Sequence, residues 1–391
     1  MNRIYLDNNA TTRPLPEVVD AVQQGLERCW ANPSSIHRAG QEARQRVDRA
    51  RESVAALVGA KTPDITFTSG GTEAANLAIL AALRARAPRR LVVTSAVEHP
   101  AVGELLETLR SRADIEPLEI ENDEDGVVSP DHLRQMLEER GEEVALVSIM
   151  WCNNETGVIE PIEELAGICH ERGIPLHSDG TQWVGKMPVN VTEVPVDLLS
   201  FASHKFHGPK GVGALYSRPG FAPTPAVIGG PQERRRRGGT ENVPGILGFG
   251  VAAQLAKDWL TEEHIAERMR IRDDFEQQLL DRIEGLYVHS ASSPRAWTTS
   301  AVSFAELESE LILLMLSERG VFASGGAACT SGALKESSAM DAMGRPGVGL
   351  WGRVRFSVDR ETSPQVLSEA IPIVVEAVAH LRGVRSTLHS A

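Results

Sequence analysis

The sequence predicts an α/β protein with a mostly parallel sheet covered by helices in a large domain, and a smaller α+β domain beside it. Two observations predict this class. Up to about Val243, short apolar, β-branched segments alternate with longer segments of helical periodicity. Beyond that point, long helical segments precede a mixture of strands and helices. The length of 391 residues is enough for two or three domains.

The elements follow from these patterns in chain order. In the large domain, strands are predicted over residues 64–69, 91–96, 144–150, 174–178, 198–202 and 213–217. Helices between them are predicted over 72–86, 101–112, 130–140 and 162–172. In the smaller domain, we expect helices over 245–260, 262–283, 310–318 and 364–381, and strands over 286–290, 301–304 and 354–358. Parallel sheets of this kind bind ligands beyond the carboxyl ends of their strands, so we expect functional residues there.

Composition and charge exclude several classes of protein. Apolar residues make up 42% and charged residues 24% of the chain, a balance typical of folded globular proteins and not of disordered ones. The net charge of -13 disfavours binding to nucleic acid. No signal peptide or membrane-spanning segment is evident, and the four cysteines are too far apart for a zinc cluster or a disulfide framework. We therefore expect a cytoplasmic protein with reduced thiols and no bound metal.

Polar motifs follow several of the predicted strands. Gly70 and Gly71 lie between a strand and a helix, either as a phosphate seat at the helix N-terminus or as a plain turn with a helix cap. His99 follows the next strand, as a catalytic group or an ordinary buried polar residue. The four arginines 234–237 form either a solvated loop or a contact for a phosphate or a partner.

Two charged residues follow strands that should be buried on both faces. Asp179 ends one strand, and a buried carboxylate requires a cationic partner. Lys205 follows the next strand, and it is one of only six lysines in the chain. A phosphate seat, an aromatic His99, a buried carboxylate and a strand-end lysine are together the parts of a pyridoxal phosphate site.

Seven motifs in the same order resemble the cysteine desulfurases, and in particular their nitrogen-fixation and iron-sulfur-assembly group. The motifs are YLDNNATT (5–12), NPSSIH (32–37), TSGGTE (68–73), EH (98–99), NNETG (153–157), HKFHGPKG (204–211) and RGGTEN (237–242). The resemblance runs from about Ile4 to past Arg355. It implies the pyridoxal-phosphate transferase fold type I of class V aminotransferases, with a seven-stranded type of sheet. It places the large cofactor domain at 14–255 and the small domain at 1–13 and 256–391.

The resemblance also implies the roles of individual residues. Lys205 would form the Schiff base with pyridoxal 5'-phosphate, and Asp179 would pair with the pyridinium nitrogen. His99 would stack on the ring and move protons. Asn154 and Gln182 would lie near the phenolic oxygen of the cofactor. The other cofactor contacts would be Gly71, Thr72, Ser203, His204 and, from the second subunit of a homodimer, Thr240. Arg355 and Asn154 would bind the substrate carboxylate.

Cys329 completes the implied site. Small residues flank it in segment 323–332, so nothing bulky is available to bury the thiol, and an exposed thiolate is the reactive form. Cys29, Cys152 and Cys169 are expected to be inert. By resemblance, Cys329 takes the sulfur of L-cysteine as a persulfide, releases L-alanine, and passes the sulfur to an iron-sulfur scaffold or another acceptor protein.

The chain departs from the family pattern at several positions. Gly180 replaces the usual alanine after the strand-end aspartate, and the order Ala202-Ser203 moves the usual serine to the other face of the strand. Ala327 and the pair Lys335-Glu336 differ around the cysteine loop. The chain ends soon after Leu381, without the extension that contacts a scaffold in housekeeping members, so we expect a different or looser acceptor.

Two other functions fit the same residues less well. A selenocysteine lyase or another class V aminotransferase-fold enzyme would use the same cofactor, but transamination needs no thiol such as Cys329. A non-catalytic sulfur-relay or scaffold protein would be expected to have lost at least one of Lys205, Asp179, His99 and Arg355, and all four are present. The sequence does not identify the sulfur acceptor or the choice between cysteine and selenocysteine.

Overall fold

A computed structural model describes residues 3–221, 223–325 and 351–389. Its centre is a seven-stranded sheet with the order β2-β8-β7-β6-β5-β3-β4. Strand β8 runs antiparallel to both neighbours and the other pairs are parallel, so the predicted mostly parallel sheet is confirmed. The strands are β2 (Ile65–Thr68), β3 (Leu91–Ser95), β4 (Glu116–Ile120), β5 (Val144–Ser148), β6 (Leu176–Asp179), β7 (Leu198–Ala202) and β8 (Gly213–Ser217).

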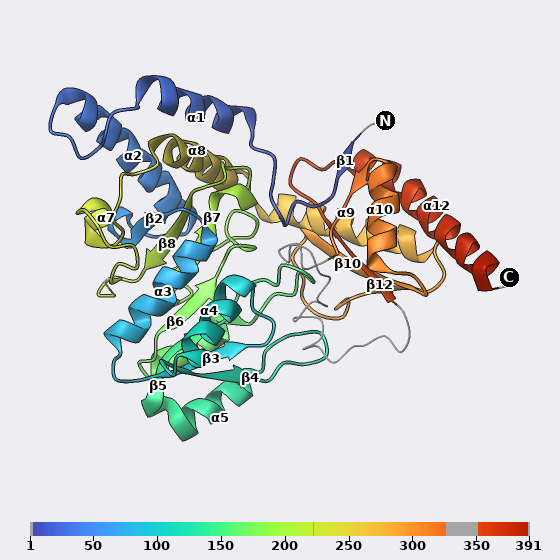
Figure 1. Ribbon diagram of the computed structural model, residues 1–391, viewed down its shortest axis with the longest axis horizontal. Coiled ribbons are helices and arrows are strands. Elements are labelled where there is room, and N and C mark those ends of the chain that lie inside the picture. The colour runs from blue at the N-terminus through green and yellow to red at the C-terminus, as the bar shows by residue number, and fades with distance from the viewer. Residues whose placement is uncertain (1–2, 222, 326–350, 390–391) are drawn as a thin grey trace.

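Helices cover this sheet (Figure 1). They are α1 (Pro16–Arg28), α2 (Arg38–Leu57), α3 (Gly71–Ala85), α4 (Pro100–Ser111), α5 (Pro130–Arg140), α6 (Ile162–Glu171), the short α7 (Gln232–Arg235) and α8 (Val243–Trp259), with 3-10 turns η1 (Thr62–Asp64), η2 (Gly141–Glu143) and η3 (Ser203–Lys205). Helix α3 packs on β7 and β8, whereas α8 packs on α1 and α2. The central strands β5, β6 and β7 are buried along their whole length, as expected for parallel strands covered on both faces.

A second region contains a three-stranded antiparallel sheet of order β12-β10-β9. Its elements are α9 (Glu262–Leu280), β9 (Leu286–Val288), β10 (Thr299–Ala305), α10 (Ser309–Glu318), β11 (Val321–Phe322), β12 (Trp351–Ser357) and α12 (Pro364–His389). Strand β1 (Ile4–Tyr5) pairs with β11, so the first residues of the chain pack in this region (Figure 1). The pairing agrees with the predicted contribution of residues 1–13 to the small domain, although the exact boundaries stay a prediction.

Several elements of the large region were not predicted, among them β4, α1 and α2. Strand β4 lies at the edge of the sheet and buries only one of its five residues, so it lacks the apolar run by which buried strands are recognised. Helices α1 and α2 precede the first predicted strand. Helix α2 is rich in arginine but buries Ala43, Val47, Ala50 and Val54 at helical spacing, so the pattern was present in the sequence. Among the described residues, no helix is long and apolar enough to cross a membrane.

Candidate active site

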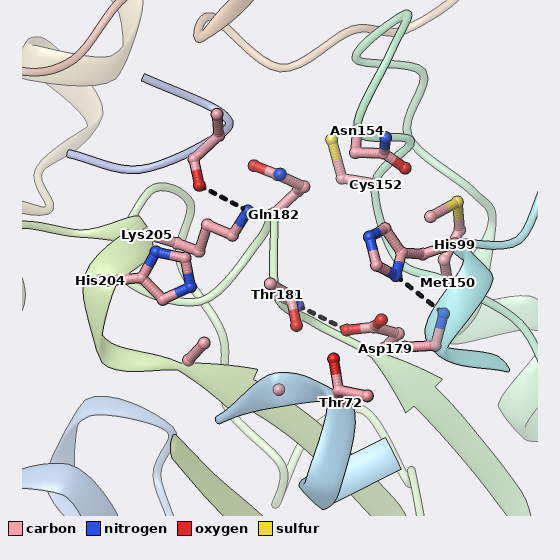
Figure 2. Close-up of a pocket in the computed structure, with 14 residues that line it drawn as sticks. Thr72, His99, Met150, Cys152, Asn154, Asp179, Thr181, Gln182, His204 and Lys205 are labelled. Atoms are coloured by element: carbon pink, nitrogen blue, oxygen red, sulfur yellow. Dashed lines mark hydrogen bonds between the residues drawn. The ribbon is translucent and has the colours of Figure 1, made fainter. Parts of the chain in front are cut away.

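A cavity of about 210 Å³ opens beyond the carboxyl ends of β6 and β7, next to the start of α3. This is the position that the parallel sheet predicts for a ligand site. Figure 2 shows side chains from several distant segments around it. The lining residues are Ala10, Gly71, Thr72, His99, Ala101, Met150, Cys152, Asn154, Asp179, Thr181, Gln182, Ala202, His204 and Lys205.

Asp179 ends β6 and is 5% exposed. Its Oδ1 accepts hydrogen bonds from the N–H of Thr181 at 2.9 Å and from Oγ of Ser200 at 3.4 Å. Both donors are neutral, and the carboxylate forms no ion pair within the described part of the chain. Its negative charge is therefore available to a cation in the cavity, as the sequence predicts.

His177 supports Asp179 from inside the sheet. The ring lies between Oγ of Ser148, 2.9 Å from Nδ1, and Oγ of Ser200, 3.0 Å from Nε2. Because the Asp179 carboxylate can only accept, Ser200 donates to it and accepts from Nε2–H of His177. Complete burial lowers the pKa of His177 to about 4, so the ring is neutral. Ser148, His177, Asp179 and Ser200 are called the strand floor below.

His99 caps α4 from the end of β3. Its Nδ1 accepts from the N–H of Ala101 at 3.0 Å, and Pro100 occupies the first helical turn as predicted. Burial lowers the pKa of His99. The neutral ring therefore carries its proton on Nε2, and the ring lines the cavity. His99 thus caps a helix and also lines the cavity, and its catalytic role stays a prediction.

Glu98, the preceding residue, is buried. Its Oε1 accepts from Oγ of Ser95 at 2.8 Å and from the N–H of Met150 at 2.7 Å. Burial raises the pKa of Glu98 to about 8. The neutral acid thus ties the loop before α4 to the end of β5 without adding a negative charge beside Asp179.

Lys205 lies in η3, directly after β7, and enters the cavity from the side opposite Asp179 (Figure 2). Its Nζ donates to the carbonyl oxygens of Asn9 at 2.7 Å and Ala10 at 3.1 Å. The amine is therefore held by the backbone of a segment almost 200 residues away in the sequence, a separation of 196 residues for Asn9.

The start of α3 lies on a third side of the cavity. Gly71 and Thr72 line it, and a Cβ added at Gly70 would meet no atom within 4 Å. The first N–H groups of a helix have no intrahelical acceptor and attract anions. His204 also lines the cavity, and burial lowers its pKa to about 4. At the same turn the N–H of Ser69 donates to Oε2 of Glu73 at 2.9 Å, as in a helix cap. The phosphate seat therefore stays a prediction.

Asn154 and Arg355 meet at the rim. Arg355 Nη1 donates to the carbonyl oxygen of Asn154 at 2.9 Å, and Nη2 pairs with Oδ1 of Asp7 at 2.8 Å. The Arg355 side chain is 4% exposed. Asn154 lines the cavity, whereas Arg355 contacts Asn154 but does not itself line the cavity.

Two implied cofactor contacts lie elsewhere. Ser203 is fully buried and does not line the cavity, whereas Ala202 does. Successive residues at a strand end point to opposite faces, and Ser203 packs against Gly208, where a Cβ would lie 1.8 Å from its Oγ. The cavity lining thus does not support the assignment of Ser203 to the cofactor, which stays a prediction. Thr240 lines a separate cavity of about 160 Å³ beside Arg237, so its role across a dimer stays a prediction.

The arginine run 234–237 is largely held by the protein itself. Arg237 pairs with Glu73 in the first turn of α3 at 2.9 Å, and Arg234 and Arg236 donate to carbonyl oxygens of residues 62 and 63. The preceding Glu233 forms a buried bidentate pair with Arg51 at 2.6 and 2.7 Å. These contacts disfavour the solvated-loop interpretation for Arg237.

The predicted reactive thiol, Cys329, lies outside the described residues. The other three cysteines are free and buried. Burial raises the pKa values of the Cys152 and Cys169 thiols to about 12, which agrees with the expectation that they are inert. No cluster of three or more metal-ligating side chains occurs in the described ranges.

Sequence reasoning missed Lys186 and Asn9. Lys186 Nζ is buried behind the cavity and donates to Oδ1 of Asn9 at 3.1 Å and to Oε1 of Gln182 at 2.5 Å. The signal available in the sequence was a lysine four residues after Gln182 in a segment that is otherwise apolar or small. Asn9, Ala10, Gln182, Lys186 and Lys205 are called the N-terminal wall below.

Comparison with known proteins places these features in a family. The model of the aminotransferase class-V family matches residues 4–365. A cysteine desulfurase of Gluconacetobacter diazotrophicus is 44% identical over 383 residues, which cover 98% of this chain and 95% of that protein.

Two solved structures are similar over nearly the whole chain. A NifS-like protein superposes with a TM-score of 0.88 at 32% identity and covers 97% of this chain and 100% of its own. A structure described as SspA in complex with cysteine has a TM-score of 0.79 at 28% identity and covers 92% of this chain and 99% of its own.

Proposed function

This chain belongs to the aminotransferase class-V family and, within it, to the cysteine desulfurases, and we propose that it converts L-cysteine into L-alanine while transferring the sulfur to its own Cys329. The observation that carries the proposal is the placement of Lys205, Asp179 and the N-terminus of α3 on three sides of one cavity. An amine, a carboxylate and a set of N–H donors are what an amino-acid-binding pyridoxal phosphate site requires.

The residues present fit pyridoxal 5'-phosphate. The Asp179 carboxylate is buried with only neutral donors, so a protonated ring nitrogen would complete its pairing. The space at Gly70 leaves the helix N-terminus open to a phosphate, which Gly71, Thr72 and His204 would hold. When bound, the cofactor supplies a ring that absorbs the negative charge developing at the substrate Cα.

Lys205 has two tasks in this proposal. Its Nζ would hold the cofactor covalently, and its neutral amine would take the proton from the substrate Cα. Its present acceptors are the Asn9 and Ala10 carbonyls, which leave the amine pointing into the cavity from the wall opposite Asp179. The backbone contacts thus orient the amine.

His99 and Arg355 act on the substrate. His99 is neutral at pH 7 because burial lowers its pKa, so Nε2–H provides a proton donor at the face of the cavity. Arg355 and Asn154 would bind the substrate carboxylate at the rim, with Asp7 holding the guanidinium in place.

The sulfur step balances without an external oxidant. The Cys329 thiolate attacks Sγ of the substrate, an S–S bond forms, and the Cβ–Sγ bond breaks with its electron pair left on Cβ. A proton then quenches Cβ and alanine is released. The sum is L-cysteine plus enzyme thiol giving L-alanine plus enzyme persulfide, in which the carbon is reduced and the sulfur oxidised.

The experiment is to incubate the full-length protein with pyridoxal phosphate, L-cysteine and a reductant, and to quantify alanine and sulfide. Equal amounts of both are expected from the wild type. Cys329→Ala should keep the yellow colour of the bound cofactor and lose desulfuration. Cys169→Ala, a buried thiol on α6 away from the cavity, is the matched control and should keep the wild-type rate. Sulfide release by Cys329→Ala at the normal rate would overturn the assignment.

Finer points belong to the same proposal. The protein forms a homodimer in which Thr240 reaches the cofactor of the second subunit. The exposed apolar side chains of Trp30 (76%), Ile36 (91%) and Ile228 (85%) are candidates for its interface. The persulfide is delivered to an iron-sulfur scaffold or another acceptor protein. The free buried thiols are compatible with a cytoplasmic location, where cysteines stay reduced.

A further inference from the structure

Lys186 is a buried cation for which the implied active site has no role. The residue is 4% exposed and follows β6 in the same turn as Gln182. Its Nζ donates to two side-chain oxygens, Oδ1 of Asn9 at 3.1 Å and Oε1 of Gln182 at 2.5 Å. Among the residues with described positions, no carboxylate pairs with it. Burying an ammonium with neutral acceptors alone is costly, and such groups are typical of functional sites.

The ammonium sets the orientation of Gln182. A lysine ammonium donates and does not accept, so the amide oxygen of Gln182 must face Lys186. The amide nitrogen then faces the other way, and one of its N–H groups donates to the Asn9 carbonyl oxygen at 3.0 Å. The second N–H remains for the cavity, which Gln182 lines.

The same argument orients Asn9. Its Oδ1 faces Lys186, so its Nδ2 faces away and donates to Oγ1 of Thr299 at 2.7 Å and to the Asn154 carbonyl at 3.3 Å. Its own carbonyl oxygen accepts from both Gln182 and Lys205. Lys186 therefore orients the residue that connects the cavity lysine with the rim.

We propose that Lys186 is a positioning residue of this site. It acts through Gln182, because it forces the Gln182 amide to present an N–H donor to the phenolic oxygen of bound pyridoxal phosphate. The inference rests on the proposed function, because it assumes that cofactor. The family resemblance already places Gln182 near this phenolic oxygen. The structure adds that Lys186 determines which end of the Gln182 amide points toward it.

Burial, and then the neighbouring Lys205, lower the pKa of Lys186 to about 7, with smaller effects from Cys152 and Asp359, which raise it, and Arg355, which lowers it. The ammonium, which donates and does not accept, is therefore the main form of Lys186 below pH 7. An N–H donor with a cation behind it favours the anionic form of an oxygen. Removing Lys186 should therefore disfavour ionisation of the ring oxygen and move the pH midpoint of the cofactor's visible absorption upward.

The test compares Lys186→Met with Lys257→Met in the full-length protein. Lys257 is exposed on α8, so its replacement is the matched control. Two quantities are measured: the dissociation constant for pyridoxal phosphate by equilibrium dialysis, and the pH midpoint of the absorption band. Lys186→Met is expected to bind about tenfold more weakly, equivalent to 1.4 kcal/mol, and to raise the midpoint by about one pH unit. Lys257→Met should change neither. An unchanged midpoint in Lys186→Met overturns the proposal.

A double-mutant cycle separates positioning from a general structural effect. If Lys186 acts through Gln182, Lys186→Met should add nothing to the shift caused by Gln182→Met. Independent, additive shifts would contradict the proposal. Lys186→Arg, which also only donates, should restore part of the wild-type midpoint.

If Lys186→Met does not fold, the proposal is tested with a second variant, Lys186→Gln. Lys186→Gln is polar and similar in length, but its amide both donates and accepts, so it no longer fixes the direction of Gln182. The midpoint should rise in this variant too, and a wild-type value would overturn the proposal. Failure of the proposed function itself looks different, because the wild-type protein would then bind no pyridoxal phosphate at all.

Discussion

The strand floor and the N-terminal wall enclose the same cavity but are built in opposite ways. The floor joins side chains of the adjacent strands β5, β6 and β7 through a chain of hydrogen bonds that ends at the Asp179 carboxylate, with its histidine and serines fully buried. The wall joins segments up to 196 residues apart and carries two lysines. Asp179 of the floor lines the cavity and serves the ligand, whereas Ser148, His177 and Ser200 belong to the folding core. Substitutions at these three core residues should mainly reduce stability, and substitutions in the wall should mainly reduce cofactor retention.

The largest effect is expected in the wall, at Lys205→Ala. Hydride reduction of the wild-type protein with bound cofactor should fix the cofactor to the chain, and the variant should show no such mass increase. The free energy of unfolding should change by only about 1 kcal/mol, the usual net contribution of hydrogen bonds such as those that Nζ donates to the Asn9 and Ala10 carbonyls.

Mass spectrometry and urea unfolding measure these two quantities. Lys257→Ala, on the exposed face of α8, serves as the control for both. A retained mass increase in Lys205→Ala would remove Lys205 from its assigned role, and a large loss of stability would remove the contrast between wall and floor.

The next effect is expected in the floor, at His177→Leu. The change removes two hydrogen bonds and leaves buried serine hydroxyls without a ring partner, so we expect a loss of about 2–4 kcal/mol in the free energy of unfolding at pH 8. Ser178→Ala, whose Oγ is buried and makes no hydrogen bond in the described structure, is a neighbouring control with a small expected effect.

The same variant should respond differently to pH. The folded-state pKa of His177 is lowered from 6.5 to about 4, so its contribution to stability is present above pH 6.5 and is lost as the pH falls through 4. The His177→Leu variant has no imidazole at this position and therefore does not lose stability in this way as the pH falls. The stability difference between the two proteins should therefore shrink between pH 6.5 and 4, and a constant difference would contradict the neutral, buried state of the ring.

The smallest effect is expected at Gly180→Ala, which restores the residue usual in the family. An added Cβ would lie 2.7 Å from Cδ1 of Leu199 and 3.1 Å from Cγ2 of Val184, both ends of side chains that can shift. We expect a destabilisation of about 1 kcal/mol, measured by urea unfolding, because the core must repack slightly. An increase in stability would mean that these side chains move freely.

Much of the fold was predictable because local patterns specify it. Strands β7 and β8 and helix α5 match their predicted ranges, and the apolar runs that define buried strands come from consecutive residues. Strand β4 was missed because its exposed edge position requires no apolar run. The strand-end positions of His99, Asp179 and Lys205 were predictable for the same reason, since a strand's end is a local property.

The sequence by itself determined the parallel sheet, the strand ends that carry Asp179 and Lys205, and the glycine turn before α3, because each depends on neighbours along the chain. Only the tertiary structure decided that Lys186 is buried, that Asn9 connects it with Lys205, and that Ser203 points away from the cavity. The physical reason is that burial and hydrogen-bond partners depend on segments that are remote in sequence and meet only when the chain folds.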